Sequence, residues 1–242
     1  MTSPALTYRR ILLKYSGEVL RGTAPFGVEL EALDYVVQSI QKLRQLGVEV
    51  AIVLGGGNFF RGKNLLSSGF DQVKADQMGM CATIMNAIAL EHALSKHQIK
   101  TTVFSAIPML GFLPTYDIQM ARDALAQGEV VICAGGTGSP YFTTDSAASL
   151  RAIELQADVV LKATKVDGIY TDDPLKNPQA KRYERLSFDE VIQNKLEVMD
   201  TTAICLCAQN QMPIQVFDMN DDTALSRIVL GEHVGTLVGV KS

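Results

Sequence analysis

The sequence alternates short, continuously apolar runs with longer segments of helical periodicity, and this alternation constrains the fold more than any other feature. Six of the runs are rich in β-branched residues and span residues 10–16, 48–57, 100–106, 129–136, 157–164 and 212–219. Runs without polar alternation are typical of strands that are covered on both faces. We therefore predict an α/β fold, namely a three-layer αβα sandwich with a mainly parallel central sheet.

The segments between these runs carry helix signals. Apolar residues recur at helical spacing within residues 30–47 and again within residues 71–95. Ser187 and Glu190 have the spacing of a capping box. Because no repeat or Pro/Gly/Ser-rich linker interrupts the pattern, we expect a single domain over residues 1–242. The longest irregular stretch, residues 171–184, could form a mobile flap.

Composition narrows the classes of partner. The formal net charge of −4 at pH 7 disfavours a whole-surface attraction to nucleic acid. No apolar stretch approaches membrane-spanning length, and we expect no signal peptide, no membrane partner and no nucleic-acid partner. Three of the four cysteines lie in apolar runs, and none has metal-ligand spacing. This usage indicates reduced, buried thiols and a cytoplasmic location.

Lys14 is unusual because it stands inside an apolar run and is followed by Ser16 and Gly17. A buried ammonium is costly unless it reaches a partner or a solvent-filled cleft. One interpretation is a lysine on an edge strand that extends to solvent. The other, which we favour, is a cation directed at phosphate, because ligands of open α/β sheets bind outside the carboxyl ends of strands.

The second run ends in three glycines, Gly55–Gly57, followed by Arg61. Glycines let the backbone approach a ligand, and successive N–H groups can form an anion-binding concavity to which an arginine adds a forked donor. Residues 57–64 come close to a P-loop, but Asn64 stands where that motif needs Ser or Thr. We reject a P-loop and retain an anion site.

The fourth run ends in Gly135 and Gly136, Gly138 follows, and the hydroxyls of Thr143 and Thr144 precede Asp145. An isolated aspartate there would be a helix N-cap. Beside a glycine turn and two threonines, Asp145 could instead orient a lysine or a magnesium–phosphate unit. Tyr141 occupies the last glycine position of a dinucleotide fingerprint, which excludes that motif.

Two further residues, Tyr170 and Asp76, could contact a nucleoside. Tyr170 lies among charged residues in a segment that would ordinarily be a solvated loop. Asp76 is either an early-helix acid or an acceptor for ribose hydroxyls. The three histidines, His92, His97 and His233, are expected at the surface. We therefore predict no nucleophile–histidine pair. Anion cradles and cations without a general base favour phosphoryl transfer.

Seven segments, in order along nearly the whole chain, closely resemble the bacterial uridylate kinases of the amino acid kinase family. They are "RILLKYSGEVLRG", "GGGNFFRG", "DQMGMCATIMNA", "GTGSPYFTTDSAA", "LKATKVDGIYTDDP", "EVMD" and "MPIQVFDMN". The resemblance implies that ATP and UMP react to give ADP and UDP. It also implies Mg²⁺ held with ATP, mostly by phosphates and water, rather than by a dedicated protein cage.

The resemblance also implies roles for individual residues. The catalytic set is Lys14, Asp145, Asp200 and Arg61. The ATP set is Lys14, Tyr15, Ser16, Gly17, Gly57, Arg61, Thr164, Tyr170 and Asp173. The UMP set is Gly56, Asp76, Thr137, Gly138, Ser139, Pro140, Tyr141, Phe142, Thr143 and Thr144. Lys14 would stabilise charge on the moving phosphoryl group, Asp145 would orient that lysine, and Asp200 would organise the metal side.

Members of the family are similar in forming homohexamers that GTP activates and UTP inhibits. The segment matching the GTP-linked region is Gly22, Thr23, Ala24, Pro25, Phe26 and Gly27. The chain departs from its relatives at Ser139, where asparagine is common, and at Pro25, where glycine is common. These departures bear on uracil recognition and on the GTP response.

Two alternative functions remain at this point. One is a kinase of the same fold that makes an acyl phosphate from glutamate, aspartate or carbamate, and the other is a non-catalytic nucleotide-binding regulator.

Overall fold

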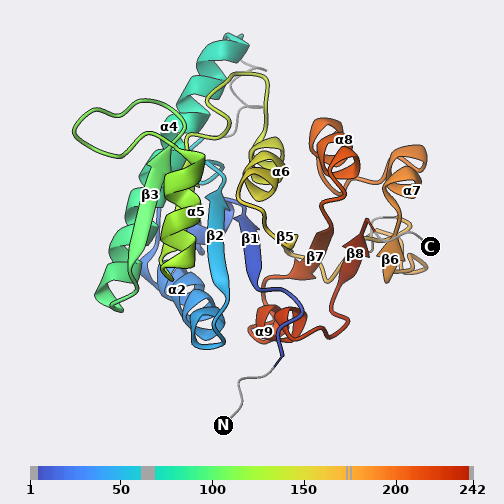
Figure 1. Cartoon of the computed structure of the whole chain (residues 1–242). Helices are drawn as coiled ribbons and strands as arrows, with labels where there is room; N and C mark the ends of the chain where they lie inside the picture. Colours follow the sequence, from blue (N-terminus) through green and yellow to red (C-terminus); the bar gives the residue numbers. More distant parts are fainter. Residues whose placement is uncertain (1–4, 61–68, 173, 175, 240–242) are drawn as a thin grey trace.

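The computed structural model describes residues 5–60, 69–172, 174 and 176–239. Its centre is an eight-stranded sheet in the order β3-β4-β2-β1-β5-β7-β8-β6 (Figure 1). The strands are β1 Arg10–Tyr15, β2 Glu49–Leu54, β3 Thr101–Ser105, β4 Val130–Ala134, β5 Val159–Thr164, β6 Arg185–Leu186, β7 Ile214–Asp218 and β8 Thr236–Val238. All neighbours pair in parallel except β7 and β8, which are antiparallel.

Each of the six predicted strands is present within its predicted run. The two strands that the sequence did not predict, β6 and β8, have only two and three residues. Segments this short carry too few residues for a hydrophobic period to stand out. They extend the sheet on the side of β7, away from the glycine-rich turns.

The helices are α1 Glu18–Arg21, α2 Leu30–Gln45, α4 Gln72–Lys96, α5 Ile118–Ala126, α6 Thr144–Glu154, α7 Phe188–Gln193, α8 Thr201–Gln209 and α9 Ala224–Val229. Both predicted long helices, α2 and α4, are confirmed. The predicted capping box opens α7, where Ser187 and Glu190 satisfy each other's backbone N–H groups.

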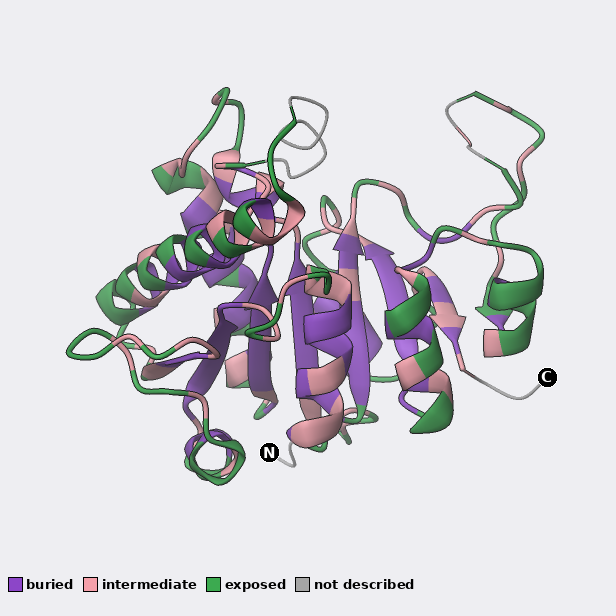
Figure 2. Cartoon of the chain, turned by 90° about the horizontal axis from the view of Figure 1, so that it is seen from above, coloured by how far each residue is buried: buried purple, intermediate pink, exposed green. Residues whose placement is uncertain are grey.

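The sheet separates two hydrophobic cores, which confirms the predicted αβα sandwich. Along β1, Ile11, Leu13 and Tyr15 pack into the core that contains side chains of α2, α4 and α9. Leu12 points to the opposite face and packs with side chains of α5, α6 and α8. Figure 2 shows the buried residues concentrated in the strands and in the helix surfaces that face them. Both faces of the central strands are therefore covered, as their continuous apolar runs require.

The cysteines correct one expectation. Cys133 and Cys207 are buried, and burial raises the pKa of these thiols to about 12 and about 11. Cys81 and Cys205 are exposed, so the prediction of buried thiols is wrong for these two, which lie on outward faces of α4 and α8. All four thiols are free.

Two further expectations concern the surface. The three histidines are exposed, as predicted. Among the described residues, no helix has the length and apolar character needed to cross a membrane.

Candidate active site

The carboxyl ends of β4, β2, β1 and β5 lie side by side because these strands are consecutive neighbours in the sheet. The glycine-rich turns after β1, β2 and β4 therefore lie close together at the carboxyl ends of the strands, as expected. β1 lies between β2 and β5, so the interpretation of Lys14 as an edge-strand lysine is wrong. Lys14 instead pairs in register with a second lysine, Lys162 of β5.

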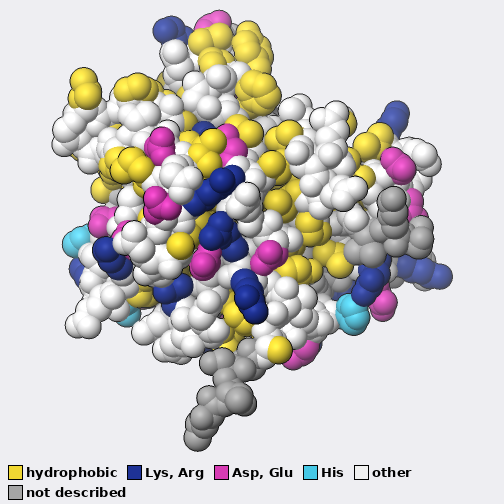
Figure 3. Space-filling view, viewed as in Figure 1, with side chains coloured by type: hydrophobic (Ala, Val, Ile, Leu, Met, Phe, Trp, Pro, Cys, Tyr) yellow, Lys and Arg dark blue, Asp and Glu magenta, His cyan; other side chains and the backbone are white. Residues whose placement is uncertain are grey.

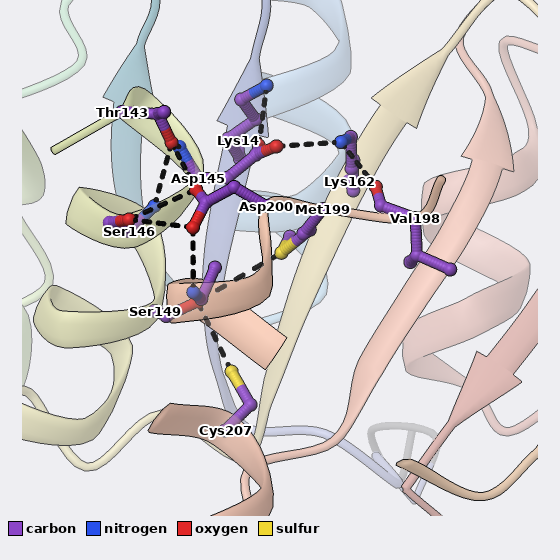
Figure 4. Close-up of polar contacts among 11 residues, drawn as sticks. Lys14, Thr143, Asp145, Ser146, Ser149, Lys162, Val198, Met199, Asp200 and Cys207 are labelled. Carbon is purple, nitrogen blue, oxygen red and sulfur yellow. Dashed lines mark hydrogen bonds and ion pairs between the residues drawn. The ribbon is translucent and has the colours of Figure 1, made fainter. Parts of the chain in front are cut away.

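Lys14 and Lys162 share one carboxylate, that of Asp145 (Figure 4). The Lys14 Nζ lies 2.9 Å from Asp145 Oδ1, and the Lys162 Nζ lies 3.0 Å from Asp145 Oδ2. Lys162 also donates to the backbone carbonyl of Val198 at 2.5 Å. The three charged side chains are between 11% and 16% exposed, so they form a mostly buried cluster. We call Lys14, Asp145 and Lys162 the lysine–aspartate cluster.

Asp145 is not the N-cap of α6, because Thr143 accepts the capping N–H groups. Burial alone would raise the pKa of Asp145, but the two ammonium groups outweigh it and hold that pKa below its ordinary value. Burial lowers the pKa of Lys162, and the nearby Asp145 carboxylate only partly offsets this. Two cations around one carboxylate leave an excess of positive charge, which suits an anionic ligand.

Asp200 joins α8 to the start of α6. It caps α8 by accepting the Ala203 N–H at 3.0 Å, and it accepts the hydroxyl of Ser146 at 3.0 and 3.1 Å. The Thr143 hydroxyl donates to the same carboxylate. Asp200 also helps to keep Lys162 charged by opposing the fall of its pKa. The predicted catalytic residues Lys14, Asp145 and Asp200 are therefore brought together.

A cavity of about 260 Å³ lies on the α4 side of the cluster. It is lined by residues of the β2 turn, the start of α4 and the loop between β4 and α6, including Gly56, Asp76, Thr137, Ser139, Phe142, Thr143 and Thr144. These seven belong to the set predicted to bind UMP. The other three members of that set, Gly138, Pro140 and Tyr141, do not line it.

Asp76 fixes the far wall of this cavity. Its carboxylate accepts the backbone N–H of Tyr141 and the side-chain amide of Gln72, each at 2.8 Å. Tyr141 is held in the left-handed region, with φ of 69°, which is costly for a residue other than glycine. The bond to Asp76 therefore compensates for backbone strain and links the loop before α6 to α4.

A second cavity, of about 660 Å³, lies on the other side of the cluster and is lined by Lys162, Thr164 and Tyr170 among others. The Thr164 hydroxyl donates to the Val166 carbonyl at 2.6 Å, and the Tyr170 hydroxyl donates to Asp167 at 2.6 Å. Thr144 lines the first cavity and directly precedes Asp145, whereas Lys162 lines the second. The lysine–aspartate cluster thus stands between two cavities.

Comparison with known proteins agrees with this geometry. The sequence profile of the amino acid kinase family matches residues 9–218. The chain belongs to the amino acid kinase family. It is 56% identical over 238 residues to uridylate kinase of Legionella pneumophila (strain Lens), covering 98% of this chain and 96% of that protein. It is 54% identical over 231 residues to uridylate kinase of Pseudomonas aeruginosa, covering 96% and 94%.

Two solved structures show the same fold. UMP kinase from Bacillus anthracis superposes with a TM-score of 0.94 at 36% identity, with 97% of both chains covered. UMP kinase from Ureaplasma parvum superposes with a TM-score of 0.90 at 35% identity, with 96% of this chain and 99% of that chain covered. The resemblance stated from the sequence motifs is confirmed.

In this amino acid kinase, several predicted ligand residues have constrained positions. The side chain of Tyr15 is 1% exposed in the core, so only its backbone could face a ligand. A Cβ on Gly55 would lie 3.0 Å from the Gly17 nitrogen, and one on Gly56 would lie 2.8 Å from Ala82 Cβ. Close packing of protein segments therefore explains two of the three consecutive glycines. Arg61 and Asp173, both predicted to bind ATP, lie outside the described residues.

Lys162 is the residue of this cluster that the sequence-based site prediction left out. The predicted strand at residues 157–164 contains it, but the sequence did not indicate that its side chain pairs with Asp145. A signal was present, because Lys162 interrupts an apolar strand just as Lys14 does. Two such lysines in neighbouring parallel strands indicate one shared buried partner.

Gly17 provides a test of the close packing between the β1 and β2 turns. A Cβ at this position would lie 2.4 Å from the Gly55 carbonyl oxygen, so we expect Gly17→Ala to force a shift in both turns. Overpacking of this kind costs about 1–3 kcal/mol in the free energy of unfolding, measurable by urea denaturation. The control is Gly57→Ala, because its Cβ would meet nothing closer than 3.8 Å. Equal stability of the two variants would contradict the prediction.

Proposed function

We propose that the protein transfers the γ-phosphoryl group of ATP to UMP, giving ADP and UDP. The observation that carries the proposal is the lysine–aspartate cluster, with its excess positive charge, between two separate cavities. Membership of the amino acid kinase family and high identity to uridylate kinases support the same conclusion. A cation cluster between two cavities suits a reaction in which two polyanions must meet.

Each of the two cavities is assigned to one substrate. We propose that UMP occupies the cavity lined by Asp76, Thr137 and Ser139, where Asp76 accepts from the ribose hydroxyls. ATP occupies the larger cavity lined by Lys162, Thr164 and Tyr170. Its phosphates extend from there toward the turn at Ser16 and Gly17 and toward Gly57, which lines the UMP cavity. The reacting phosphates then meet at the lysine–aspartate cluster.

The chemistry that remains for the chain is positioning and charge neutralisation. A phosphate oxygen of UMP attacks the γ-phosphorus of ATP in line, and the bond from that phosphorus to the β,γ-bridging oxygen breaks. This nucleophile is already ionised, so no general base is needed. Lys14 and Lys162 neutralise charge on the moving group, and Asp145 holds both ammonium groups in place.

Magnesium enters this scheme with ATP. Within the described part of the chain, no group of three acidic, histidine or cysteine side chains could hold a metal ion. The oxygens of Asp145 face two lysines, so this carboxylate is poorly placed as a metal ligand. These residues fit a Mg²⁺ held by ATP phosphates and water, with Asp200 as the carboxylate that orders the water. The bound ion would neutralise phosphate charge.

An acceptor panel tests the proposed function. With ATP and Mg²⁺, we expect UMP to stimulate ADP release by at least about 100-fold over glutamate, aspartate or carbamate, because Asp76 and the loop hydroxyls suit a nucleotide. Release with glutamate but not UMP would instead establish an acyl-phosphate kinase. Tight binding of ATP and UMP without turnover would establish a nucleotide-binding regulator.

CMP forms a separate arm of this panel. Ser139 is shorter than asparagine and lacks an amide that pairs a donor with an acceptor, and its N–H bonds to the Thr137 hydroxyl at 3.2 Å. If Ser139 faces the base, we expect the UMP preference over CMP to rest on backbone groups or water.

Regulation and assembly are further parts of the proposal. The 22–27 segment would be linked to GTP activation, and UTP would inhibit, which titration of each nucleotide against UMP turnover tests. Leu110 and Phe112 have apolar side chains that are 98% and 73% exposed, which supports the assembly of several copies of this chain, for which we propose a homohexamer.

We also propose a single domain over residues 1–242 and, from the free thiols, a cytoplasmic location.

A further inference from the structure

Two asparagine side chains form a buried, reciprocal pair beneath the glycine turns. Asn58, just after the β2 turn, is 2% exposed, and Asn86, in the middle of α4, is fully buried. The Nδ2 of each donates to the Oδ1 of the other at 2.8 Å. We call these two residues the amide pair.

The second hydrogen of each amide reaches a different backbone carbonyl. Asn86 donates to the Gly55 carbonyl at 2.7 Å, and Asn58 donates to the Gly27 carbonyl at 2.8 Å. An asparagine amide has two donor hydrogens, so all four hydrogens of the amide pair are used. The network is complete, which is the condition under which a buried polar group is stabilising and rigid.

The amide pair connects segments that are far apart in the sequence. The Gly27 N–H also donates to the Asn58 carbonyl at 3.0 Å, so the 22–27 segment is attached to Asn58 by two bonds. A Cβ on Gly17 would lie 2.5 Å from Asn58 Oδ1, so the β1 turn packs directly on the amide pair. The Gly55 N–H in turn donates to the Tyr15 carbonyl at 2.9 Å.

Stability alone does not explain this arrangement. Apolar side chains of similar size could fill the space between β2 and α4 without the cost of desolvating two amides. What apolar side chains could not supply is direction, because each amide hydrogen fixes the position of one oxygen. The two carbonyls that the amide pair fixes belong to the turn after β2 and to the 22–27 segment.

We propose that Asn58 and Asn86 are positioning residues for phosphoryl transfer. Together they set the orientation of the Gly55–Gly57 turn and the contact of that turn with Gly17, and they attach the 22–27 segment to the same point. The proposal rests on the proposed function, because it assumes that these turns hold nucleotide phosphates. Neither asparagine needs to touch a substrate.

The test compares Asn86→Ala and Asn58→Ala with Gln215→Ala. Gln215 is a suitable control because it is also a buried amide, 6% exposed, and donates to the Val234 carbonyl at 2.6 Å. It lines neither of the two nucleotide cavities. Loss of any of these amides is expected to lower the Tm, so the comparison separates positioning from stability.

For Asn86→Ala we expect kcat/KM for ATP to fall by about 10- to 100-fold, since small misplacements at a phosphoryl-transfer site have effects of this size. Gln215→Ala should stay within about twofold of the wild type. The double variant Asn58→Ala/Asn86→Ala should lose little more than Asn86→Ala, because the two side chains act as one unit. An Asn86→Ala enzyme that loses Tm but keeps kcat/KM, or losses that add in the double variant, would overturn the proposal.

Hydrogen exchange gives an independent readout. Amides of residues 22–28 and 54–60 should exchange faster in Asn58→Ala, while those of β3 should not change. If Asn86→Ala fails to fold, Asn58→Ala carries the kinetic test, because it keeps the bond between Asn86 and Gly55. If the wild type does not phosphorylate UMP, the proposed function fails, and unchanged exchange at these turns would separately refute the amide pair's role.

Discussion

Replacement of Lys14 by methionine should lower kcat for UMP phosphorylation by at least about 10³-fold. Methionine preserves the length and apolar character of the side chain but removes the ammonium group that pairs with Asp145. Deletion of one well-placed donor to a developing charge costs about 10²–10³ in rate. The loss should be larger here because removal of the Lys14 ammonium also cancels the excess positive charge of the lysine–aspartate cluster, leaving Lys162 paired one to one with Asp145.

Binding of UMP should survive this change. Lys14 does not line the cavity that contains Asp76, so we expect the Kd for UMP, measured by calorimetry, to change by less than about threefold. Lys100→Met is the matched control, because Lys100 pairs with Glu129 at 2.5 Å outside both cavities. A Lys14→Met enzyme that retained more than a tenth of wild-type kcat would exclude Lys14 from the chemical step.

Replacement of Asp145 by asparagine is expected to have the second largest effect. The substitution leaves two ammonium groups, those of Lys14 and Lys162, without their shared carboxylate. Removing one partner of a buried ion pair costs about 3–5 kcal/mol in the free energy of unfolding. We also expect kcat to fall by at least about 100-fold, because the repelling lysines no longer keep their positions.

Glu129→Gln is the control for loss of a buried carboxylate. Glu129 accepts hydrogen bonds from Lys100 and Thr102, and these hydrogen bonds lower the pKa of Glu129. It directly precedes β4, at the amino ends of the strands, whereas the cluster lies near their carboxyl ends. This variant should lose stability and keep turnover. If Asp145→Asn behaved in the same way, Asp145 would have a structural role alone.

The pH dependence of stability offers an independent check on Asp145. Because its pKa is lowered in the folded state, its ionised form contributes stability above the unfolded pKa of about 3.9. That contribution is lost as the pH falls through the lower, folded pKa. The stability difference between wild type and Asp145→Asn should therefore be constant near neutrality and shrink below about pH 4.

Much of the fold could be predicted from the sequence because the central strands are buried on both faces. Their apolar runs are continuous, and all six were located. The short strands β6 and β8 were missed because they contribute few residues to either core. On the face shown in Figure 3, basic side chains are interspersed with acidic ones, which agrees with the modest net charge.

The candidate site could be predicted from the sequence where a charged residue interrupts an apolar strand, as Lys14 does. Pairwise relations were not predictable from one sequence. Asp145 has the pattern of a helix cap, and only the tertiary structure places it between two lysines. Likewise, Asn58 and Asn86 are 28 positions apart, and nothing in either neighbourhood indicates their mutual bonds.

The register between β1 and β5 has a consequence for how this site could change over time. Lys14 and Lys162 occupy matched rungs of one ladder, where neighbouring strands are about 4.8 Å apart. The distance between the Cα atoms of the two lysines is thus set by the strand spacing of the sheet and is independent of loop length. Insertions in the connecting loops can accumulate freely, whereas a single residue gained inside either strand would turn a lysine to the wrong face.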